Sequence, residues 1–394
     1  MLNGVPRILI IRLSAIGDVV RVLPALHALR DLHPHAQIDW AVEPKSAGIL
    51  EGHPALDRVI VFPRPDDAWS ATTAFLRFCR EIRRNRYDVV FDFHGIAKSG
   101  LIMGASLARK RVAFARPRSQ EGSALFASQR VRLPAARMNR IEENLELVRV
   151  FGAKRLNLEV EIEIPDAVQD EVDEYLTDKF HGGKRLVVLH APVDRAEKQW
   201  PLTHFAALAD LLLADGRFEV LLTWAPGQRG VVEKVQSLAR RNPEIAPETP
   251  TLKHLAALLL RSDLFIGGDT GPMHIASAVN VPVVGLFGGT DPRMHSPLRP
   301  PCAVLYGGDT PPDKPIDRAR GPELLARITP QEAWEAGLGL LKPERRPAKA
   351  ADRSDRPDGS DGSDGSDRSD RSDGSDGSDG SDRSDRPDQR PPSD

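Results

Sequence analysis

The chain has 394 residues, 40% of them hydrophobic, and a formal net charge of −2. This is enough for two domains of ordinary size, and a charge near zero singles out no charged partner. Two cysteines in unrelated contexts, Cys79 and Cys302, argue against a disulfide framework or a cysteine metal site and fit a reducing compartment. No window approaches the length of a membrane span, and no signal-peptide cleavage pattern follows the N-terminus. We therefore expect a soluble, cytoplasmic chain.

Short β-rich runs alternate with helical patterns in the first half of the chain. The expected strands are 7–13, 37–43, 58–62, 87–93 and 111–115, and the expected helices are 18–34, 70–86 and 96–110. Strands that alternate with helices imply an α/β fold with a mostly parallel sheet covered on both faces.

The same alternation begins again after an acidic segment, 156–183, which carries a helix near 167–180 and is the expected crossover. The later strands are expected at 185–191, 218–224, 264–268 and 281–288, and the later helices at 204–216, 231–241, 252–263 and 272–280. Two successive doubly wound units leave a cleft between them, and such sheets bind ligands beyond the carboxyl ends of their strands.

The tail from about residue 350 is a repeat of Asp, Ser, Gly and Arg, with Asp at every third place from Asp352 to Asp388. Without apolar residues it cannot form a core, so we expect disorder over 343–394. Either a solvating tail or an interaction segment fits this composition.

Three strand-to-helix corners carry polar residues that suit a ligand. In the corner after strand 264–268, Thr270 or Asp269 is a favoured N-cap, Gly271 lets a ligand approach the backbone, and Pro272 suits the first helical turn. The unpaired N–H groups of that helix make an anion site, most simply for a phosphate or diphosphate, to which His274 can add a donor. A plain capped helix would look similar.

Lys198 stands in the corner after strand 185–191, just before Trp200-Pro201. A lysine there would meet a developing negative charge over the cleft, and the alternative is a solvated loop residue. Asp18 opens the helix after strand 7–13, in a turn without G-x-G-x-x-G, so no dinucleotide fingerprint is present. Asp18 is either a simple N-cap or a general base that takes a proton from an acceptor hydroxyl.

The first 155 residues are basic, with roughly 25 Lys and Arg against roughly 15 Asp and Glu. The cluster comprises Arg77, Arg80, Arg83, Arg84, Arg86, Arg109, Lys110, Arg111, Arg116 and Arg118. It indicates either a solvated face or attraction to anionic lipid headgroups and acidic sugars at the cytoplasmic leaflet. The basic residues lack interleaved aromatics, so a nucleic-acid partner is not expected.

Four segments carry a likeness to a known family: ILIIRLSAIGDVVRVLPAL, YDVVFDFHGIAKSGL, the K-x-W-P segment at Lys198–Pro201, and FIGGDTGPMHIASAVNVPVVGLFGGTDP. Together they resemble glycosyltransferase family 9, the lipopolysaccharide heptosyltransferases, over about residues 6–300. The resemblance implies the GT-B fold, in which two Rossmann-like doubly wound domains face each other across a cleft. It places an acceptor-binding domain at 1–168 and a nucleotide-sugar donor-binding domain at 169–342.

The resemblance also implies a reaction and its residues. A heptose would pass, with inversion, from a nucleotide sugar such as ADP-heptose to the inner core of a Kdo-lipid A type acceptor. Asp18 matches the catalytic base and Lys198 the lysine that binds the donor diphosphate. The other implied residues are Asp269, Thr270, Gly271, Pro272, Met273, His274 and Gln228 for the donor, and Ser14, Gly17, Lys98 and Ser99 for the acceptor.

Four departures from the family pattern leave the nucleotide and the sugar open. His94 stands where Gln is frequent, Gly268 where Asn is frequent, and Gln228 where a Glu that could bind the ribose is usual. The loop 191–197 lacks the Ser or Thr that frequently contacts the diphosphate. Rival hypotheses are another sugar on the same fold, a sugar-nucleotide epimerase, and a nucleotide-sugar-binding protein without turnover. No metal or other cofactor is expected, because no carboxylate cluster lies near these loops.

Overall fold

The computed structural model describes residues 5–65, 67–153, 158, 160–298, 301–309 and 316–341. The tail 343–394 lies outside the described residues, and Met1–Arg345 form one compact unit. Among the described residues, no helix combines the length and the apolar character needed to cross a bilayer.

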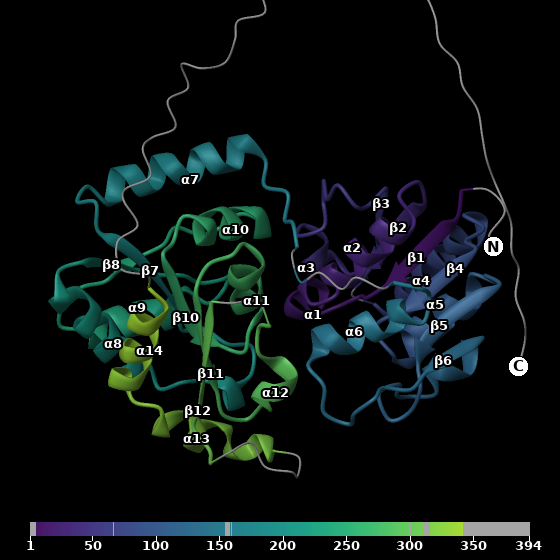
Figure 1. Cartoon of the computed structure of the whole chain (residues 1–394). Coiled ribbons are helices and arrows are strands. Elements are labelled where there is room, and N and C mark those ends of the chain that lie inside the picture. Colours follow the sequence, from purple (N-terminus) through teal and green to yellow (C-terminus); the bar gives the residue numbers. More distant parts are fainter. Residues whose placement is uncertain are drawn as a thin grey trace, which may run out of the picture. The chain divides into compact units, whose positions relative to one another are not determined.

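Each half of this compact unit builds one six-stranded parallel sheet (Figure 1). The first sheet consists of β1 (Arg7–Ile11), β2 (Gln37–Val42), β3 (Arg58–Val61), β4 (Val89–Asp92), β5 (Lys110–Phe114) and β6 (Gln129–Val131), in the order β3-β2-β1-β4-β5-β6. Its helices are α1 (Ile16–Val20), α2 (Leu23–Leu32), α3 (Pro44–Ala47), α4 (Ala68–Arg84), α5 (Ala97–Ala105), the 3-10 helix η1 (Ser123–Phe126) and α6 (Arg140–Arg149).

The second sheet consists of β7 (Arg185–His190), β8 (Phe218–Leu222), β9 (Glu244–Ile245), β10 (Leu264–Gly268), β11 (Val283–Phe287) and β12 (Cys302–Tyr306), in the order β12-β11-β10-β7-β8-β9. Its helical elements are α7 (Asp166–Lys179), η2 (Ala196–Lys198), α8 (Leu202–Asp215), α9 (Arg229–Leu238), α10 (Leu252–Leu260), α11 (Gly271–Ala278), α12 (Pro292–His295), η3 (Arg318–Arg320), α13 (Gly321–Arg327) and α14 (Pro330–Leu340). The α/β fold class expected from the alternation of strands and helices is confirmed.

The inner strands β4, β10 and β11 are buried on both faces, which explains why they read as continuous apolar runs. In β1, Ile8 and Ile10 belong to one hydrophobic cluster, whereas Leu9 and Ile11 belong to the cluster beneath α4 and α5. Alternate side chains of a strand point to opposite faces, so one strand serves both layers.

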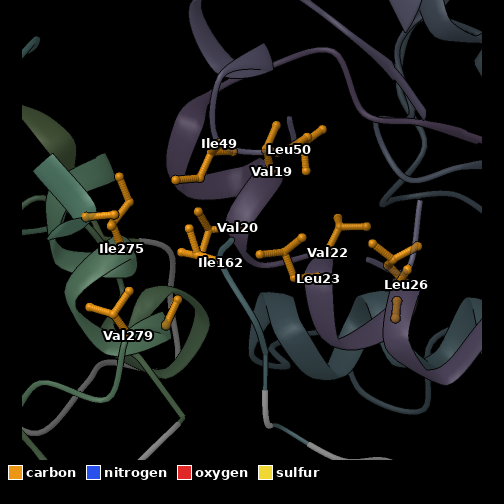
Figure 2. Packing of buried hydrophobic residues seen from close by; sticks show 14 of the residues in the cluster. Val19, Val20, Val22, Leu23, Leu26, Ile49, Leu50, Ile162, Ile275 and Val279 are labelled. Atoms are coloured by element: carbon orange, nitrogen blue, oxygen red, sulfur yellow. The ribbon is translucent and has the colours of Figure 1, made fainter. Parts of the chain in front are cut away.

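One hydrophobic cluster contains residues of both sheets' helices (Figure 2). Val19 and Val20 of α1 lie in it together with Ile275 of α11 and Val279 just beyond. Full burial of an aliphatic side chain stabilises a fold by about 1.5–3 kcal/mol. The packing of α1 on α11 therefore joins the two strand-to-helix corners that the sequence singled out.

Two glycines allow this close approach. A Cβ on Gly17 would stand 2.7 Å from Cδ2 of His274, and a Cβ on Gly271 would stand 3.1 Å from Cβ of Ile16. The first distance is shorter than side chains tolerate without a shift, so the first corner needs glycine where it contacts the second.

The helix expected over 18–34 is wrong as a single element. The structure has two helices, α1 and α2, with Val22 as the N-cap of α2. Pro24 lies in the first turn of α2 and has no N–H to donate to the carbonyl of Val20, so a continuous helix would lose a hydrogen bond there.

Candidate functional site

A cavity of about 300 Å³ lies at the carboxyl ends of the strands, where α1 meets α11. Its lining residues are Ala15, Gly17, Asp18, Arg21, Asp194, Arg195, Glu197, Lys198, Asp269, Thr270, Gly271, His274, Thr290, His295 and Arg318. The three corners predicted from sequence therefore meet at one cavity, with Asp18, Lys198 and Thr270 in its wall.

Asp18 does not cap its helix. The N-cap of α1 is Ala15, and no side chain caps the first turn. The Asp18 carboxylate instead forms ion pairs with Arg12, and with Arg21 at 3.4 Å. Both guanidinium groups are buried, whereas 32% of the Asp18 side chain is exposed. A half-buried carboxylate with an open side toward the cavity fits the general-base interpretation better than the N-cap interpretation.

The two arginines determine the charge state of Asp18. Burial on its own would raise the pKa of this carboxyl group, but the positive charges of Arg12 and Arg21 hold its pKa well below the usual range. Asp18 is therefore ionised at neutral pH.

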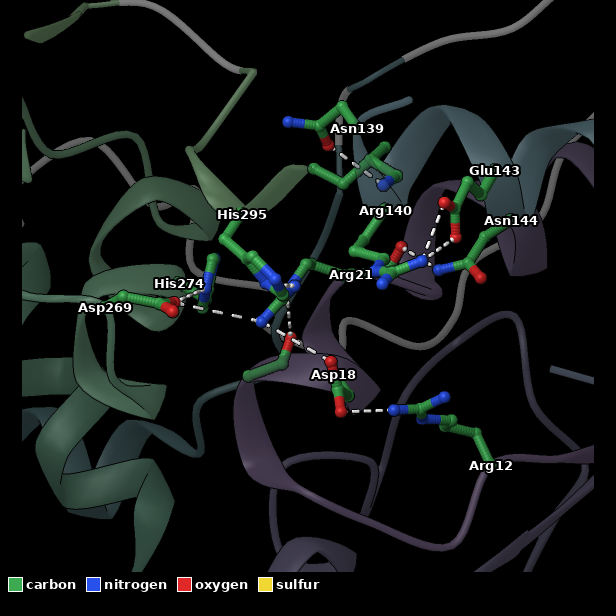
Figure 3. A network of polar contacts seen from close by, with 12 residues as sticks. Arg12, Asp18, Arg21, Asn139, Arg140, Glu143, Asn144, Asp269, His274 and His295 are labelled. Carbon is green, nitrogen blue, oxygen red and sulfur yellow. Dashed lines mark hydrogen bonds and ion pairs between the residues drawn. The ribbon is translucent and has the colours of Figure 1, made fainter. Parts of the chain in front are cut away.

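Arg21 lies between Asp18 and Asp269 (Figure 3). Its Nη2 is 3.4 Å from Asp18 Oδ1 and 4.0 Å from Asp269 Oδ1, and its Nη1 is 3.0 Å from Nδ1 of His295. A single buried cation thus links the corner after β1 to the corner after β10 and to α12. Arg12, Arg21 and His295 were not predicted from the sequence; Arg21 could have been, because residues i and i+3 share a helix face.

The corner after β10 leaves the start of α11 without a side-chain cap. Thr270 is the N-cap, but its hydroxyl oxygen lies 3.4 Å from the Gly268 carbonyl oxygen and accepts no bond from the helix. The first N–H groups of α11 carry partial positive charge, and an anion in the cavity can accept from them. This geometry supports the predicted anion site.

Lys198 faces the same corner. Its ammonium group donates to the Asp269 backbone carbonyl at 2.7 Å and to Asp269 Oδ2 at 2.8 Å. The Asp269 side chain is buried, and the hydrogen bond from His274 and the charge of Lys198 outweigh the effect of that burial, so its pKa lies well below the ordinary value. Asp269 thus positions Lys198 and His274 in the cavity wall, and the cations are the groups available to an anionic ligand.

Two neutral histidines complete the wall. Burial, together with the positive charge of Arg21, lowers the pKa of His274 to about 4. Burial and the nearby cations likewise lower the pKa of His295 to about 4 despite the carboxylate of Asp269. At neutral pH both rings are uncharged, so the positive charge of the wall comes from lysine and arginine: Lys198 and Arg21, with Arg195 and Arg318 also in the lining.

Several of the predicted site residues do not line this cavity. Met273 is fully buried in the core, and Pro272 occupies the first turn of α11. Ser14 and Gln228 do not line the cavity either. Gln228 is the N-cap of α9, which follows β8, and strand β7 lies between β8 and β10 in the sheet. Ser99 is buried, where its hydroxyl donates to Asp92 Oδ2 at 2.9 Å.

Lys98 lines a second hollow of about 390 Å³ together with Phe62, Arg64 and Phe75. Its ammonium lies 5.1 Å from the centre of the Phe62 ring and 3.4 Å from Glu43 Oε1. The acceptor role expected for Lys98 stays a prediction, and it would be exerted from this hollow at the end of β3.

Metal binding finds no support in the side chains that the structure describes. Nowhere in 5–65, 67–153, 160–298, 301–309 or 316–341 do three or more His, Cys, Asp or Glu side chains gather in an arrangement that could hold a metal ion. The expectation that no metal is required stays a prediction.

Comparison with known proteins identifies the family. Residues 75–316 match glycosyltransferase family 9 (heptosyltransferase). The chain belongs to glycosyltransferase family 9. It is therefore a glycosyltransferase, as the four sequence segments indicated.

Relatives within the family cover most of the chain. Lipopolysaccharide heptosyltransferase 1 of Campylobacter coli is 28% identical over 301 residues, 72% of this chain and 84% of that protein. Lipopolysaccharide heptosyltransferase 1 of Escherichia coli K12 is 29% identical over 297 residues, 73% of this chain and 89% of that protein.

Solved structures share the fold. A family 9 glycosyltransferase from Veillonella parvula superposes with a TM-score of 0.74 at 23% identity, covering 85% of this chain and 97% of that one. E. coli heptosyltransferase WaaC with ADP superposes with a TM-score of 0.65 at 22% identity, covering 84% and 98%. The GT-B architecture expected from the resemblance is confirmed.

Proposed function

We propose that the chain transfers a heptose, with inversion, from ADP-heptose to the inner core of lipopolysaccharide. One observation carries the proposal: a carboxylate from the first sheet and a cationic, amide-rich corner of the second line the same cavity. The names of the relatives support the acceptor, and WaaC structures with ADP and with ADP-2-deoxy-2-fluoro heptose support the donor.

In this mechanism the acceptor hydroxyl lies against Asp18 and attacks the anomeric carbon from the face opposite the diphosphate. The new C–O bond forms as the bond to the diphosphate breaks, and the electron pair leaves with the diphosphate. Lys198, Arg21 and the N–H groups after Thr270 stabilise the charge that gathers there, which is usually the largest contribution to such catalysis.

Asp18 receives the hydroxyl proton. A carboxylate held ionised by two arginines is a weak base, and general bases work best when their pKa lies near the working pH. The hydroxyl becomes strongly acidic once its oxygen bonds to the anomeric carbon, so proton transfer to Asp18 comes late, after bond formation has advanced.

The cellular setting follows from the same proposal. Cys79 and Cys302 are free thiols, which fits a reducing compartment such as the cytoplasm. Nucleotide-sugar donors and the cytoplasmic face of the inner membrane would both be available to the protein there.

The test combines a donor screen with an isosteric variant. Purified full-length protein is offered ADP-, UDP- and GDP-sugars with a Kdo-lipid A type acceptor, and release of nucleoside diphosphate is measured. Asp18→Asn is expected to lower transfer about 100- to 10,000-fold while ADP affinity is retained. Asp173→Asn is the matched control, since Asp173 also pairs with an arginine, Arg261, but does not line the cavity.

Two results would overturn the proposal. Wild-type transfer rates in Asp18→Asn would show that Asp18 is not the catalytic base. A wild-type protein that binds ADP but releases it from no sugar donor would favour a binding protein without turnover.

A further inference from the structure

The outward face of α4 exposes two large apolar side chains. Phe78 and Ile82 of this helix are buried against the first sheet, whereas Trp69 is 79% exposed and Leu76 is 61% exposed. Residues seven apart lie on the same face of a helix, so Trp69 and Leu76 form one outward stripe. Isolated exposed leucines are ordinary, but a tryptophan with most of its surface in water calls for a partner.

Arginines continue this stripe toward the end of the helix. Arg80 and Arg83 follow Leu76 at intervals of four and three residues, so they share its face. The helix contains four arginines, Arg77, Arg80, Arg83 and Arg84, and one acidic residue, Glu81, which gives it a net charge of +3. All four arginines are exposed.

Neighbouring elements extend the apolar surface. Helix α5 packs against α4 (Figure 1), and η1 packs against α5. Side chains of all three elements belong to one hydrophobic cluster or pack against it. The exposed side chains of α5 and η1 include Leu101 and Leu125, which is 76% exposed, and Leu107 is exposed just beyond the end of α5. We call the surface formed by α4, α5 and η1, with its exposed Trp69, Leu76, Leu101, Leu107 and Leu125, the α4 face.

Part of the basic cluster expected from sequence does not reach this surface. Arg111 donates to the carbonyls of Ala108 and Phe126 at 2.6 and 2.7 Å, and Arg118 pairs with the buried carboxylate of Glu143 at 2.9 Å. These two side chains stabilise loops instead of meeting a ligand. The four arginines of α4 are exposed, so they can bind an external anion.

The combination of side chains discriminates between occupants. A twofold self-association through this face would bring two copies of α4, each with a net charge of +3, into one contact, so the charges of that contact would repel overall. An anionic bilayer matches both features, because tryptophan settles at the headgroup level and arginine extends its cation to the lipid phosphates.

We propose that the α4 face docks the chain on an anionic lipid bilayer. Trp69 and Leu76 enter the headgroup region, and Arg80 and Arg83 contact the lipid phosphates. The inference deepens the proposed function, on which it rests for the lipid-linked acceptor, and it explains how a chain with no membrane-crossing helix among its described residues reaches that acceptor. The hollow that holds Lys98 is lined by Phe75 of the same helix, so docking brings this hollow to the membrane surface.

Vesicle flotation with the full-length protein tests the docking, with neither donor nor acceptor present. Wild type is expected to float with phosphatidylcholine vesicles that contain phosphatidylglycerol, less with phosphatidylcholine alone, and less at high salt. Each arginine near an anionic surface is worth about fivefold in affinity, so Arg80→Gln/Arg83→Gln is expected to bind roughly 25-fold more weakly. Trp69→Ser/Leu76→Ser is expected to lose roughly tenfold or more.

The matched control is Leu238→Ser/Leu260→Ser, which removes two exposed leucines that belong to α9 and α10 over the second sheet. It is expected to bind vesicles as wild type does, and thermal denaturation shows that all variants are folded. Wild-type binding by both α4 variants, or binding that ignores phosphatidylglycerol and salt, would overturn the proposal.

A separate measurement keeps the two proposals apart. Wild type that binds ADP but no vesicles refutes the docking surface and leaves the transferase proposal standing. Wild type that binds vesicles but no ADP refutes the transferase proposal and leaves the docking surface standing.

Discussion

The contact between the two corners gives a prediction that needs no ligand. In the structure, an added methyl group on Gly17 would lie 2.7 Å from Cδ2 of His274, and one on Gly271 would lie 3.1 Å from Cβ of Ile16. Gly48 offers the matched control, because nothing lies within 4 Å of the position that its Cβ would take and its φ is −57°. Alanine at these three positions therefore forms a graded series.

The magnitudes follow from two opposing effects. Glycine to alanine at a compatible position stabilises a protein by about 0.4–1 kcal/mol, because the unfolded chain loses freedom. An additional methyl group forced into a packed site costs about 1–3 kcal/mol. Gly48→Ala is thus expected to be slightly more stable than wild type, and Gly17→Ala to be about 1–3 kcal/mol less stable than Gly48→Ala. Gly271→Ala lies between them, since its neighbour needs to move by only a few tenths of an ångström.

Differential scanning calorimetry of the full-length variants measures the order of their Tm values, and titration calorimetry measures ADP binding. Gly17→Ala is expected to bind ADP more weakly, because the new methyl group displaces His274 from the cavity wall. A Gly17→Ala protein with the Tm of Gly48→Ala would refute the packing of α1 on α11 as described.

Three further predictions concern charge. Lys198→Met is expected to lower transfer about 100- to 1,000-fold, as the loss of one preorganised donor does, and steady-state kinetics with wild-type turnover would contradict it. Arg21→Gln removes one of the cations that lower the pKa of Asp18, so the acidic limb of the kcat/KM profile is expected to move to higher pH. Arg21→Lys keeps the positive charge and is expected to leave the limb in place. An unmoved limb in Arg21→Gln would refute the assignment of that limb to Asp18. Burial lowers the pKa of His190 to about 4, whereas the pKa of histidine in an unfolded chain is about 6.5. Between these two pH values the unfolded state binds more protons than the folded state. The free energy of unfolding therefore falls as the pH drops from 6.5 to 4. His190→Gln is expected to reduce the slope of the free energy of unfolding against pH by about 1.4 kcal/mol per pH unit. Denaturant unfolding at a series of pH values measures this slope, and equal slopes in His190→Gln and wild type would count against the prediction.

Local patterns predicted the elements that are apolar and sharply bounded. The strand expected at 264–268 is β10, because its apolar run is bounded by Asp263 and by the turn after Gly268. The short or polar strands were not predicted: β6 has three residues with an exposed Gln129 and Arg130, and β12 is a partly exposed edge strand. Helix α6 was missed although Asn139 caps it and its apolar side chains have helical spacing.

The sequence predicted those site residues whose positions are determined by the ends of strands. Residues at the ends of β1, β7 and β10 converge because these strands lie at the middle of their sheets. Lys98 faces a different hollow because Glu43, at the end of β2, attracts it, and no local pattern reveals that partner. The links from Arg12 to Asp18 and from Arg21 to His295 depend on tertiary packing, so their roles required the structure.

The apolar cluster shared by α1 and α11 has a thermodynamic consequence. If both sheets draw stability from the same buried side chains, neither can open fully without exposing the other's core, and the halves melt together. A nucleotide that binds only the second corner then slows amide hydrogen exchange in β1, a strand it never touches.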